Sequence, residues 1–180
     1  MNFTEYNVND KNLEEILLAL KSLDTVEAVA LGGSRSTGEA DENSDYDIYV
    51  YCSEIPTGKT RENLLGKYCS VAEFGNHYWE SEDNTVMNNG TPVDIIYREI
   101  DRFGRYIDTV IKGGKAFNGY TTAFWHNIRN SKVLFDKTGT FTKFRDMVQI
   151  DYPENLRRAI IKNNRSLLSG KLPSYDRQIK

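Results

Sequence analysis

The sequence predicts an α+β fold, in which a mixed β-sheet is flanked by helices. Three short apolar segments rich in β-branched and aromatic residues, at 25–31, 45–52 and 91–97, are typical of strands. Apolar residues recur at helical spacing in two segments, 10–20 and 101–112. The strand–turn–helix–strand order over residues 25–52 favours a mixed sheet of about four or five strands over an all-helical or parallel doubly wound fold.

The N-terminal half supplies the first elements. Apolar residues from Leu13 to Leu20 fall at i, i+3, i+4 and i+7, which predicts a helix capped near Asn9 or Asp10. The elements expected next are a strand at 25–31, a short helix at 34–38, a polar loop at 39–44, a strand at 45–52, a turn at 56–59 and a helix at 60–68. Residues 71–86 show no clear pattern, although Asn-Asn-Gly at 88–90 signals a turn and so predicts a hairpin with a strand near 78–86.

The C-terminal half is expected to be mainly helical. Helices are expected at 101–112, 123–130 and 140–148, with a short strand at 132–136. Pro153 suits the first turn of a final helix that reaches about Ser169. Leu156, Ile160 and Leu167 share a wide apolar face on that helix, and such a face requires a cover. We therefore divide the chain into residues 1–150 and a C-terminal helix, 151–180. This helix starts a truncated helical domain, ends a minimal form of the protein, or packs on a second copy in a homodimer.

Composition narrows the class of protein. A formal charge of −3 and a pI near 5.5 argue against a general nucleic-acid-binding protein, which would carry a basic face. No segment approaches the twenty apolar residues of a membrane span, and the first ten residues lack the pattern of a signal peptide. The two cysteines, Cys52 and Cys69, have no metal-binding spacing. A cytoplasmic protein with reduced thiols and no membrane partner is expected.

The chemically informative residues surround the second and third strand segments. Gly32 and Gly33 end the strand at 25–31 and let a ligand approach the main chain closely, while Ser34 offers a hydroxyl and an N–H to a phosphate. Asp45 and Asp47 open the next strand and lie on one face of it, because strand side chains alternate. Two adjacent carboxylates repel each other unless a cation lies between them, and Mg²⁺ binds carboxylates together with substrate phosphates.

The spacing of these residues resembles the signature of the DNA polymerase β-like nucleotidyltransferase superfamily. That signature is a Gly-Ser turn, about ten further residues, and then Asp-x-Asp; a third carboxylate lies on a neighbouring strand, where Asp94 fits here. The longer run, Gly-Gly-Ser-Arg-Ser-Thr-Gly followed by Ser-Asp-Tyr-Asp-Ile, looks most like the small bacterial branch that contains aminoglycoside and lincosamide nucleotidyltransferases. The resemblance covers residues 26–98 and implies a nucleotidyltransferase domain over residues 1–150.

The resemblance implies a reaction and a site. The expected reaction is the transfer of a nucleoside monophosphate from ATP, or another nucleoside triphosphate, to an acceptor hydroxyl, with release of pyrophosphate. By resemblance, Asp45, Asp47 and Asp94 are the catalytic and metal-binding residues, and two Mg²⁺ ions are expected. The nucleotide-binding residues implied are Gly33, Ser34 and Arg35; a surface ion pair is the alternative role for Arg35.

Other candidate residues accompany these carboxylates. Tyr49 and Tyr51 share the aspartate face of their strand and are expected to line a ligand cleft. One of Glu73, His77 and Glu80 is a candidate general base, and a solvated or structural role is the alternative for His77.

Three functional classes remain open from sequence. The first is an enzyme that nucleotidylates a small-molecule hydroxyl, and this class is favoured over the others. The second is an enzyme of the toxin–antitoxin type that modifies a protein or an RNA. The third is a regulatory module that binds nucleotide without catalysis; the presence of all three carboxylates argues against it.

Overall fold

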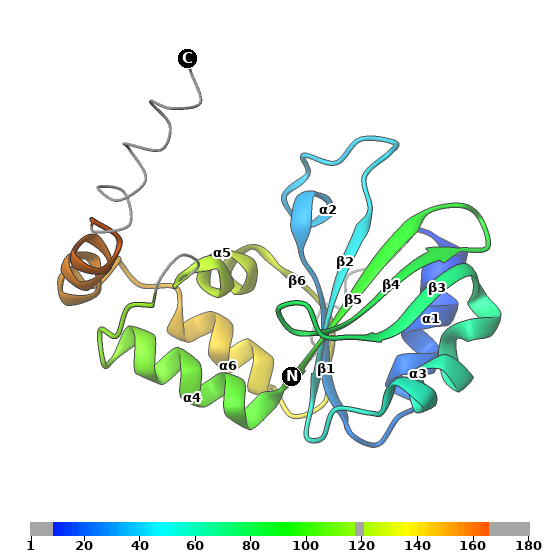
Figure 1. Cartoon of the computed structure of the whole chain (residues 1–180), viewed down its shortest axis with the longest axis horizontal. Helices are drawn as coiled ribbons and strands as arrows, with labels where there is room; N and C mark the ends of the chain where they lie inside the picture. Colours follow the sequence, from blue (N-terminus) through cyan, green and yellow to red (C-terminus); the bar gives the residue numbers. More distant parts are fainter. Residues whose placement is uncertain (1–8, 118–120, 166–180) are drawn as a thin grey trace, which may run out of the picture.

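The computed structural model describes residues 9–117 and 121–165, which form one mixed six-stranded sheet with helices on both faces (Figure 1). The strand order is β3-β4-β5-β2-β1-β6. Only β2 and β5 are parallel, and the other neighbouring strands are antiparallel. The strands are β1 (Val26–Leu31), β2 (Tyr46–Cys52), β3 (Cys69–Asn76), β4 (Ser81–Met87), β5 (Pro92–Glu99) and β6 (Lys132–Asp136). The predicted α+β fold with a mixed sheet is therefore confirmed.

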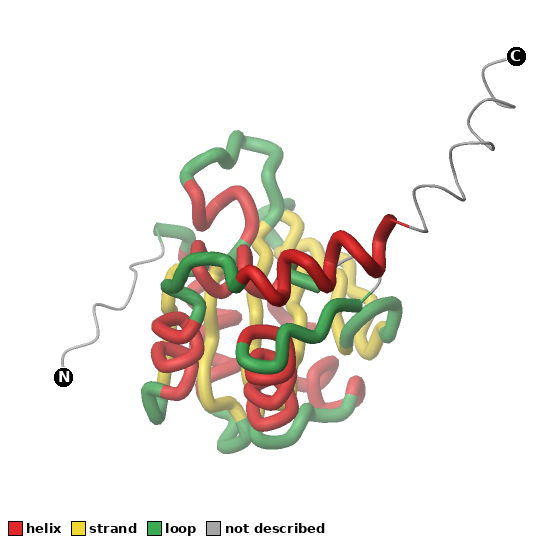
Figure 2. Tube along the Cα trace, turned by 90° about the vertical axis from the view of Figure 1, so that its left-hand side faces the viewer, coloured by secondary structure: helices red, strands yellow, loops and turns green. Residues whose placement is uncertain are grey.

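Helices α1 and α3 cover one face of the sheet, and α4, α5 and α6 lie on the other (Figures 1 and 2). The helices are α1 (Lys11–Lys21), α2 (Gly33–Thr37), α3 (Gly58–Leu65), α4 (Ile100–Ile111), α5 (Ala123–Asn130) and α6 (Thr140–Met147), and a 3-10 turn, Gly66–Tyr68, follows α3. Asp10 caps α1, since its carboxylate accepts from the N–H groups of Asn12 and Leu13. None of the helices in the described ranges is both long and apolar enough to cross a membrane.

The alternation of strand side chains divides the interior into two cores. On the first face, Ile48 and Val50 of β2 and Ile95 of β5 pack against apolar residues of α1. On the second face, Tyr49 and Tyr51 pack against α4, α5 and α6. Near the starts of β2 and β5, this second face carries the polar residues Asp47 and Asp94 instead.

The predicted number of strands, four or five, was too low. The missed strand, β3, lies at an edge of the sheet, and most of its side chains are exposed or half-buried. An exposed edge strand has no apolar face to bury, so residues 69–76 carry no alternating pattern. The hairpin predicted around residues 88–90 is present as β4 and β5, with β4 at Ser81–Met87 instead of 78–86.

Within the described part of the chain, the final helix is present over residues 154–165. Leu156 is fully buried in the second core and Ile160 packs against that core, whereas the side chain of Ile161 is 58% exposed. Residues 166–169 of the predicted helix, including Leu167, lie outside the described residues.

Candidate active site

The turn after β1 is built around the carboxylate of Asp47. The N–H of Gly32 donates to the carbonyl oxygen of Asp47 over 2.8 Å, which joins the end of β1 to β2. Gly33 has a φ of +60°, and a Cβ at this residue would lie 1.8 Å from Oδ2 of Asp47. A Cβ at Gly32 would lie 2.5 Å from the ring of Tyr49. Both glycines are therefore required by close contacts, because any side chain would displace residues of β2.

Helix α2 starts at this turn and carries the predicted phosphate-binding residues. Gly32 precedes the helix, and Ser34, in its first turn, is half-buried. The hydroxyl of Ser36 donates to the carbonyl of Gly33 over 2.7 Å, and Gly38 ends the helix with a φ of +84°. The main chain of α2 is thus held in one position beside Asp47.

Arg35 holds the loop that leads into β2. Its Nε donates to the carbonyl oxygens of Ser44, over 3.1 Å, and Asp45, over 3.0 Å. Its guanidinium also stacks on the ring of Tyr46, 4.1 Å from the ring centroid. Arg35 therefore contacts the backbone that carries Asp45 in the structure, and its two sequence-based roles, phosphate binding and a surface ion pair, stay predictions.

The three predicted carboxylates lie on neighbouring segments. Asp47 and Asp94 are register partners in the parallel pair formed by β2 and β5, and Asp45 directly precedes β2. Asp47 and Asp94 are half-buried, whereas Asp45 is exposed. Since Ile48 and Ile95 face the first core, alternation directs both half-buried carboxylates to the second face.

These carboxylates affect one another electrostatically. Burial raises the pKa of Asp47 to about 6, with further contributions from the negative charges of Asp45 and Asp94. The ionised cluster is therefore unfavourable by itself, and a cation would relieve it.

Within 9–117 and 121–165, no three His, Cys, Asp or Glu side chains form a ready-made metal site. An open pair of carboxylates suits Mg²⁺, which takes one or two protein carboxylates and completes its shell with water and substrate phosphates. The residues present therefore fit a metal that arrives with its nucleotide.

A chain of amide side chains, missed by the sequence analysis, orients Asp94. Nδ2 of Asn84 donates to Oδ1 of Asp94 over 2.9 Å, and Nδ2 of Asn76 donates to Oδ1 of Asn84 over 2.8 Å. Asn84 and Asp94 are register partners across the β4–β5 hairpin. The turn predicted at 88–90 could have revealed this pair. In a hairpin centred on Asn89, residues 84 and 94 are equally far from the turn and therefore lie opposite each other.

The two tyrosines on the aspartate face have structural partners. The hydroxyl of Tyr49 accepts from Nδ2 of Asn127 on α5 over 2.9 Å, and that of Tyr51 accepts from Arg98 over 3.2 Å. Tyr51 is only 1% exposed, so the expectation that it lines a ligand cleft was wrong: three helices cover this part of the face.

The candidate general bases lie on the β3–β4 hairpin. Glu73 is exposed on β3, and His77 is exposed in the turn that joins the two strands. Glu80 is bound by Arg98 through two hydrogen bonds, of 2.8 and 2.6 Å, so each of its carboxylate oxygens already accepts from a charged donor. A fourth carboxylate, Glu82 of β4, was missed, and the charges of Asp94 and Glu80 add to burial in raising its pKa.

Comparisons with known proteins show the family of the chain. A family model described as a nucleotidyltransferase domain matches residues 13–116, which is more than half of the chain. No curated protein matches the chain significantly. Two of the solved structures that the chain resembles are a toxin–antitoxin with AMP-PNP, at 15% identity and a TM-score of 0.45, and a mutant of the toxin–antitoxin MntA–HpeT, at 13% and 0.43. Each alignment covers 95% of this chain and 100% of the other. The family match spans β1, α2, β2 and β5, the elements that carry the glycine turn and the carboxylates, and the chain belongs to the nucleotidyltransferase domain family.

Proposed function

We propose that this chain transfers a nucleoside monophosphate from Mg²⁺-bound ATP to the hydroxyl of a small molecule and releases pyrophosphate. The observation that carries the proposal is the contact of the Asp47 carboxylate with the backbone of Gly33, next to its register partner Asp94. A phosphate bound at the Gly33 turn would therefore lie beside two carboxylates, an arrangement that is repulsive without a divalent cation.

The proposed roles follow from position. Asp45, Asp47 and Asp94 would hold two Mg²⁺ ions, which would supply positive charge to balance the charge that develops during transfer. The main chain of Gly33 and the hydroxyl of Ser34 bind the β- and γ-phosphates. Arg35 fixes the backbone that carries Asp45 through its two carbonyl contacts, so its contribution to phosphate binding is indirect.

The proposed chemistry is a single displacement at the α-phosphorus. The acceptor oxygen forms a bond to that phosphorus while the bond to the bridging oxygen breaks, and pyrophosphate leaves with the electron pair. The acceptor proton passes to Asp94 or to water. Asn84 keeps Asp94 aimed at this position, because its amide occupies the other side of the carboxylate.

Residues 1–150 form the catalytic domain, and the helix that starts at residue 154 begins a further helical part or an interface with a second copy. The 58% exposure of Ile161, on the helix whose Leu156 is fully buried, supports such a cover.

The experiment that tests the function is a pyrophosphate-release assay with Mg²⁺-ATP over a panel of hydroxyl compounds, run in parallel with EDTA. We expect release only with Mg²⁺ and only with a subset of acceptors. Equal ATP binding with and without EDTA, together with no release of pyrophosphate, would indicate a nucleotide-binding module instead of an enzyme.

A further inference from the structure

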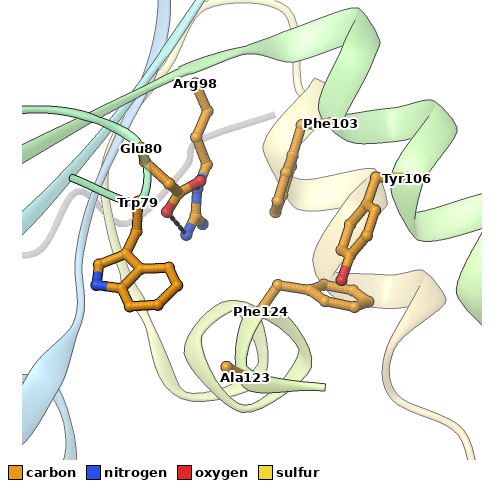
Figure 3. A pocket seen from close by; sticks show the side chains of 7 residues that line it. All are labelled: Trp79, Glu80, Arg98, Phe103, Tyr106, Ala123 and Phe124. Atoms are coloured by element: carbon orange, nitrogen blue, oxygen red, sulfur yellow. Dashed lines mark hydrogen bonds and ion pairs between the residues drawn. The ribbon is translucent and has the colours of Figure 1, made fainter. Parts of the chain in front are cut away.

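A cavity of about 600 Å³ opens between the β3–β4 turn, the end of β5 and the starts of α4 and α5 (Figure 3). Trp79 stands on one side of it and Phe124 on the other, with Phe103 and Tyr106 completing an aromatic wall. The side chain of Trp79 is 89% exposed, so the turn presents a large apolar surface to solvent at the mouth of the cavity. Exposed apolar surface beside a cavity is typical of a binding site.

The charged residues of the cavity neutralise each other. Arg98 is 8% exposed, and its Nε and Nη2 are both bound by the carboxylate of Glu80. Its third nitrogen, Nη1, donates to the hydroxyl of Tyr51. Because the guanidinium is bound on all three nitrogens, it offers little to a phosphate. The cavity is therefore suited to a flat, apolar body.

The cavity is connected to the carboxylates along one face of the sheet. The guanidinium of Arg98 lies 4.6 Å from the ring centroid of Tyr49, which is two residues after Asp47 on the same strand. Asp94 and Arg98 are four residues apart on β5, a distance of roughly 13 Å along a strand. Glu82 lies between them on the neighbouring strand, as the register partner of Ile96.

The direction of the reaction decides which substrate the cavity faces. In an in-line displacement, the attacking and leaving oxygens lie on opposite sides of the phosphorus. The proposed pyrophosphate site, α2, follows β1, whereas the cavity lies beside β4 and β5, on the other side of β2 in the sheet. The acceptor must therefore approach from the Asp94 side, where the cavity lies.

On the basis of the function proposed above, we propose that this cavity binds the acceptor, and that the acceptor is a hydroxyl compound with a flat, apolar body and no negative charge. The body lies between Trp79 and the aromatic wall, and the hydroxyl is carried on an extension of the acceptor that runs along β5, past Glu82, toward Asp94. The carboxylates of Glu82 and Asp94 exclude an anionic acceptor and favour one with an amine.

The test uses the two tryptophans as reporters. Trp125 is buried and its Nε1 donates to the carbonyl of Val148 over 3.0 Å, so the indole N–H signals of Trp79 and Trp125 in a ¹H–¹⁵N spectrum report separately. Tyramine is the probe, and 3-(4-hydroxyphenyl)propionate is its matched anion with the same phenol. We expect tyramine to shift the Trp79 signal at millimolar concentrations and to bind about fivefold or more tightly than the anion, because like charges line the path.

Variants locate the effect. Ala123→Trp places a large side chain at the mouth of the cavity, and His126→Trp places the same side chain on an exposed position of the same helix. Ala123→Trp should abolish the tyramine shift and leave Mg²⁺-ATP affinity within about twofold, while His126→Trp should change neither. Glu82→Gln should reduce the preference for the amine, while Glu15→Gln, on the opposite face of the sheet, should not.

These measurements test binding in the cavity independently of the proposed transfer reaction. No Trp79 shift with tyramine, or equal binding of the anion, would overturn the proposal. Competition between tyramine and the non-transferable Mg²⁺-α,β-methylene-ATP, or a loss of ATP affinity in Ala123→Trp, would make the cavity a nucleobase site and overturn it as well. Loss of the function alone has another signature: Mg²⁺-ATP would then fail to shift the signals of Gly33 and Ser34 in the wild-type protein.

Discussion

The carboxylate of Asp47 lies against the backbone of Gly33, so closely that a Cβ on the glycine would come within 1.8 Å of Oδ2. The two residues belong to different elements, α2 and β2, and meet because Gly32 donates a hydrogen bond to the carbonyl of Asp47. One contact thus joins the proposed phosphate-binding turn to the proposed metal-binding residue.

Replacing Gly33 with Ala should therefore damage both stability and transfer. The matched control is Gly38→Ala, because Gly38 also has a positive φ, +84°, but has nothing within 4 Å of the position of a Cβ. We expect each variant to lose about 1–2 kcal/mol of unfolding free energy from the positive φ alone. Only Gly33→Ala should also lose at least about a hundredfold in transfer rate, since it displaces Asp47, the proposed metal ligand. Equal activities of the two variants would show that the contact with Asp47 is dispensable.

Replacing Asp47 with Asn should have a larger effect on transfer than replacing Ser34 with Ala. Loss of a ligand to a metal that stabilises the transition state costs several kcal/mol, or a factor of roughly a thousand or more in rate. Ser34→Ala removes one charge-assisted hydrogen bond, about 1–2 kcal/mol, because the neighbouring main-chain N–H groups still face the phosphate. Steady-state transfer rates with Glu42→Gln as an exposed control give the order, and the reverse order would refute the metal-dependent mechanism.

The same Asp47→Asn variant should stabilise the free protein in a pH-dependent manner. The pKa of Asp47 is raised from 3.8 to about 6 in the folded state, so its protonated form stabilises the fold fully below pH 3.8, and this stabilisation is lost as the pH rises through about 6. Asparagine does not ionise, so the variant keeps this stabilisation as the pH rises. The variant should match wild type near pH 4 and exceed it by roughly 1 kcal/mol at pH 7, allowing for solvent screening of a half-exposed group. Thermal unfolding without Mg²⁺ measures this as a rise in Tm of about 2–4 °C; an unchanged difference across this pH range would contradict the raised pKa.

Replacing Asn84 with Ala should lower the rate of transfer without removing a metal ligand. The amide of Asn84 donates to Asp94 over 2.9 Å, and partners of metal-binding carboxylates typically contribute about 10–100-fold to activity or metal affinity. We expect a higher Mg²⁺ concentration for half-maximal rate, with the affinity for ATP at saturating Mg²⁺ nearly unchanged. Asn88→Ala is the control, because Asn88 lies in the same hairpin but donates to the carbonyl of Lys67. An unchanged Mg²⁺ dependence in Asn84→Ala would mean that Asp94 needs no support.

The hairpin that carries Asn84 should depend on a buried ion pair for its stability. Arg61 of α3 lies 3.2 Å from Asp83 of β4, and the side chains are 2% and 0% exposed. Arg61→Met leaves an unpaired buried carboxylate, which typically costs about 3–5 kcal/mol. Adding Asp83→Asn should recover much of that loss, because the uncompensated charge is removed. Denaturant unfolding of the single and double variants tests this; a double variant no more stable than Arg61→Met would show that the pair does not act as a unit.

The sequence by itself determined the fold class and the residues of the carboxylate cluster. β1, β2 and β5 are central and buried, so each is a run of mainly apolar, β-branched residues that can be recognised in the sequence. The glycine turn and the aspartates lie directly beside these runs. Local patterns of this kind can be predicted from the sequence, because burial and turn geometry restrict the residue type at each position separately.

Only the tertiary structure decided the rest. The edge strand β3 buries too little to leave a pattern, and Arg98, the partner of Glu80, is 18 residues away in the chain. The aromatic cavity joins residues from the β3–β4 turn, α4 and α5, which meet only when the helices close over the second face of the sheet. Helix packing creates such sites, and it depends on contacts between distant segments, which no local pattern of residues encodes.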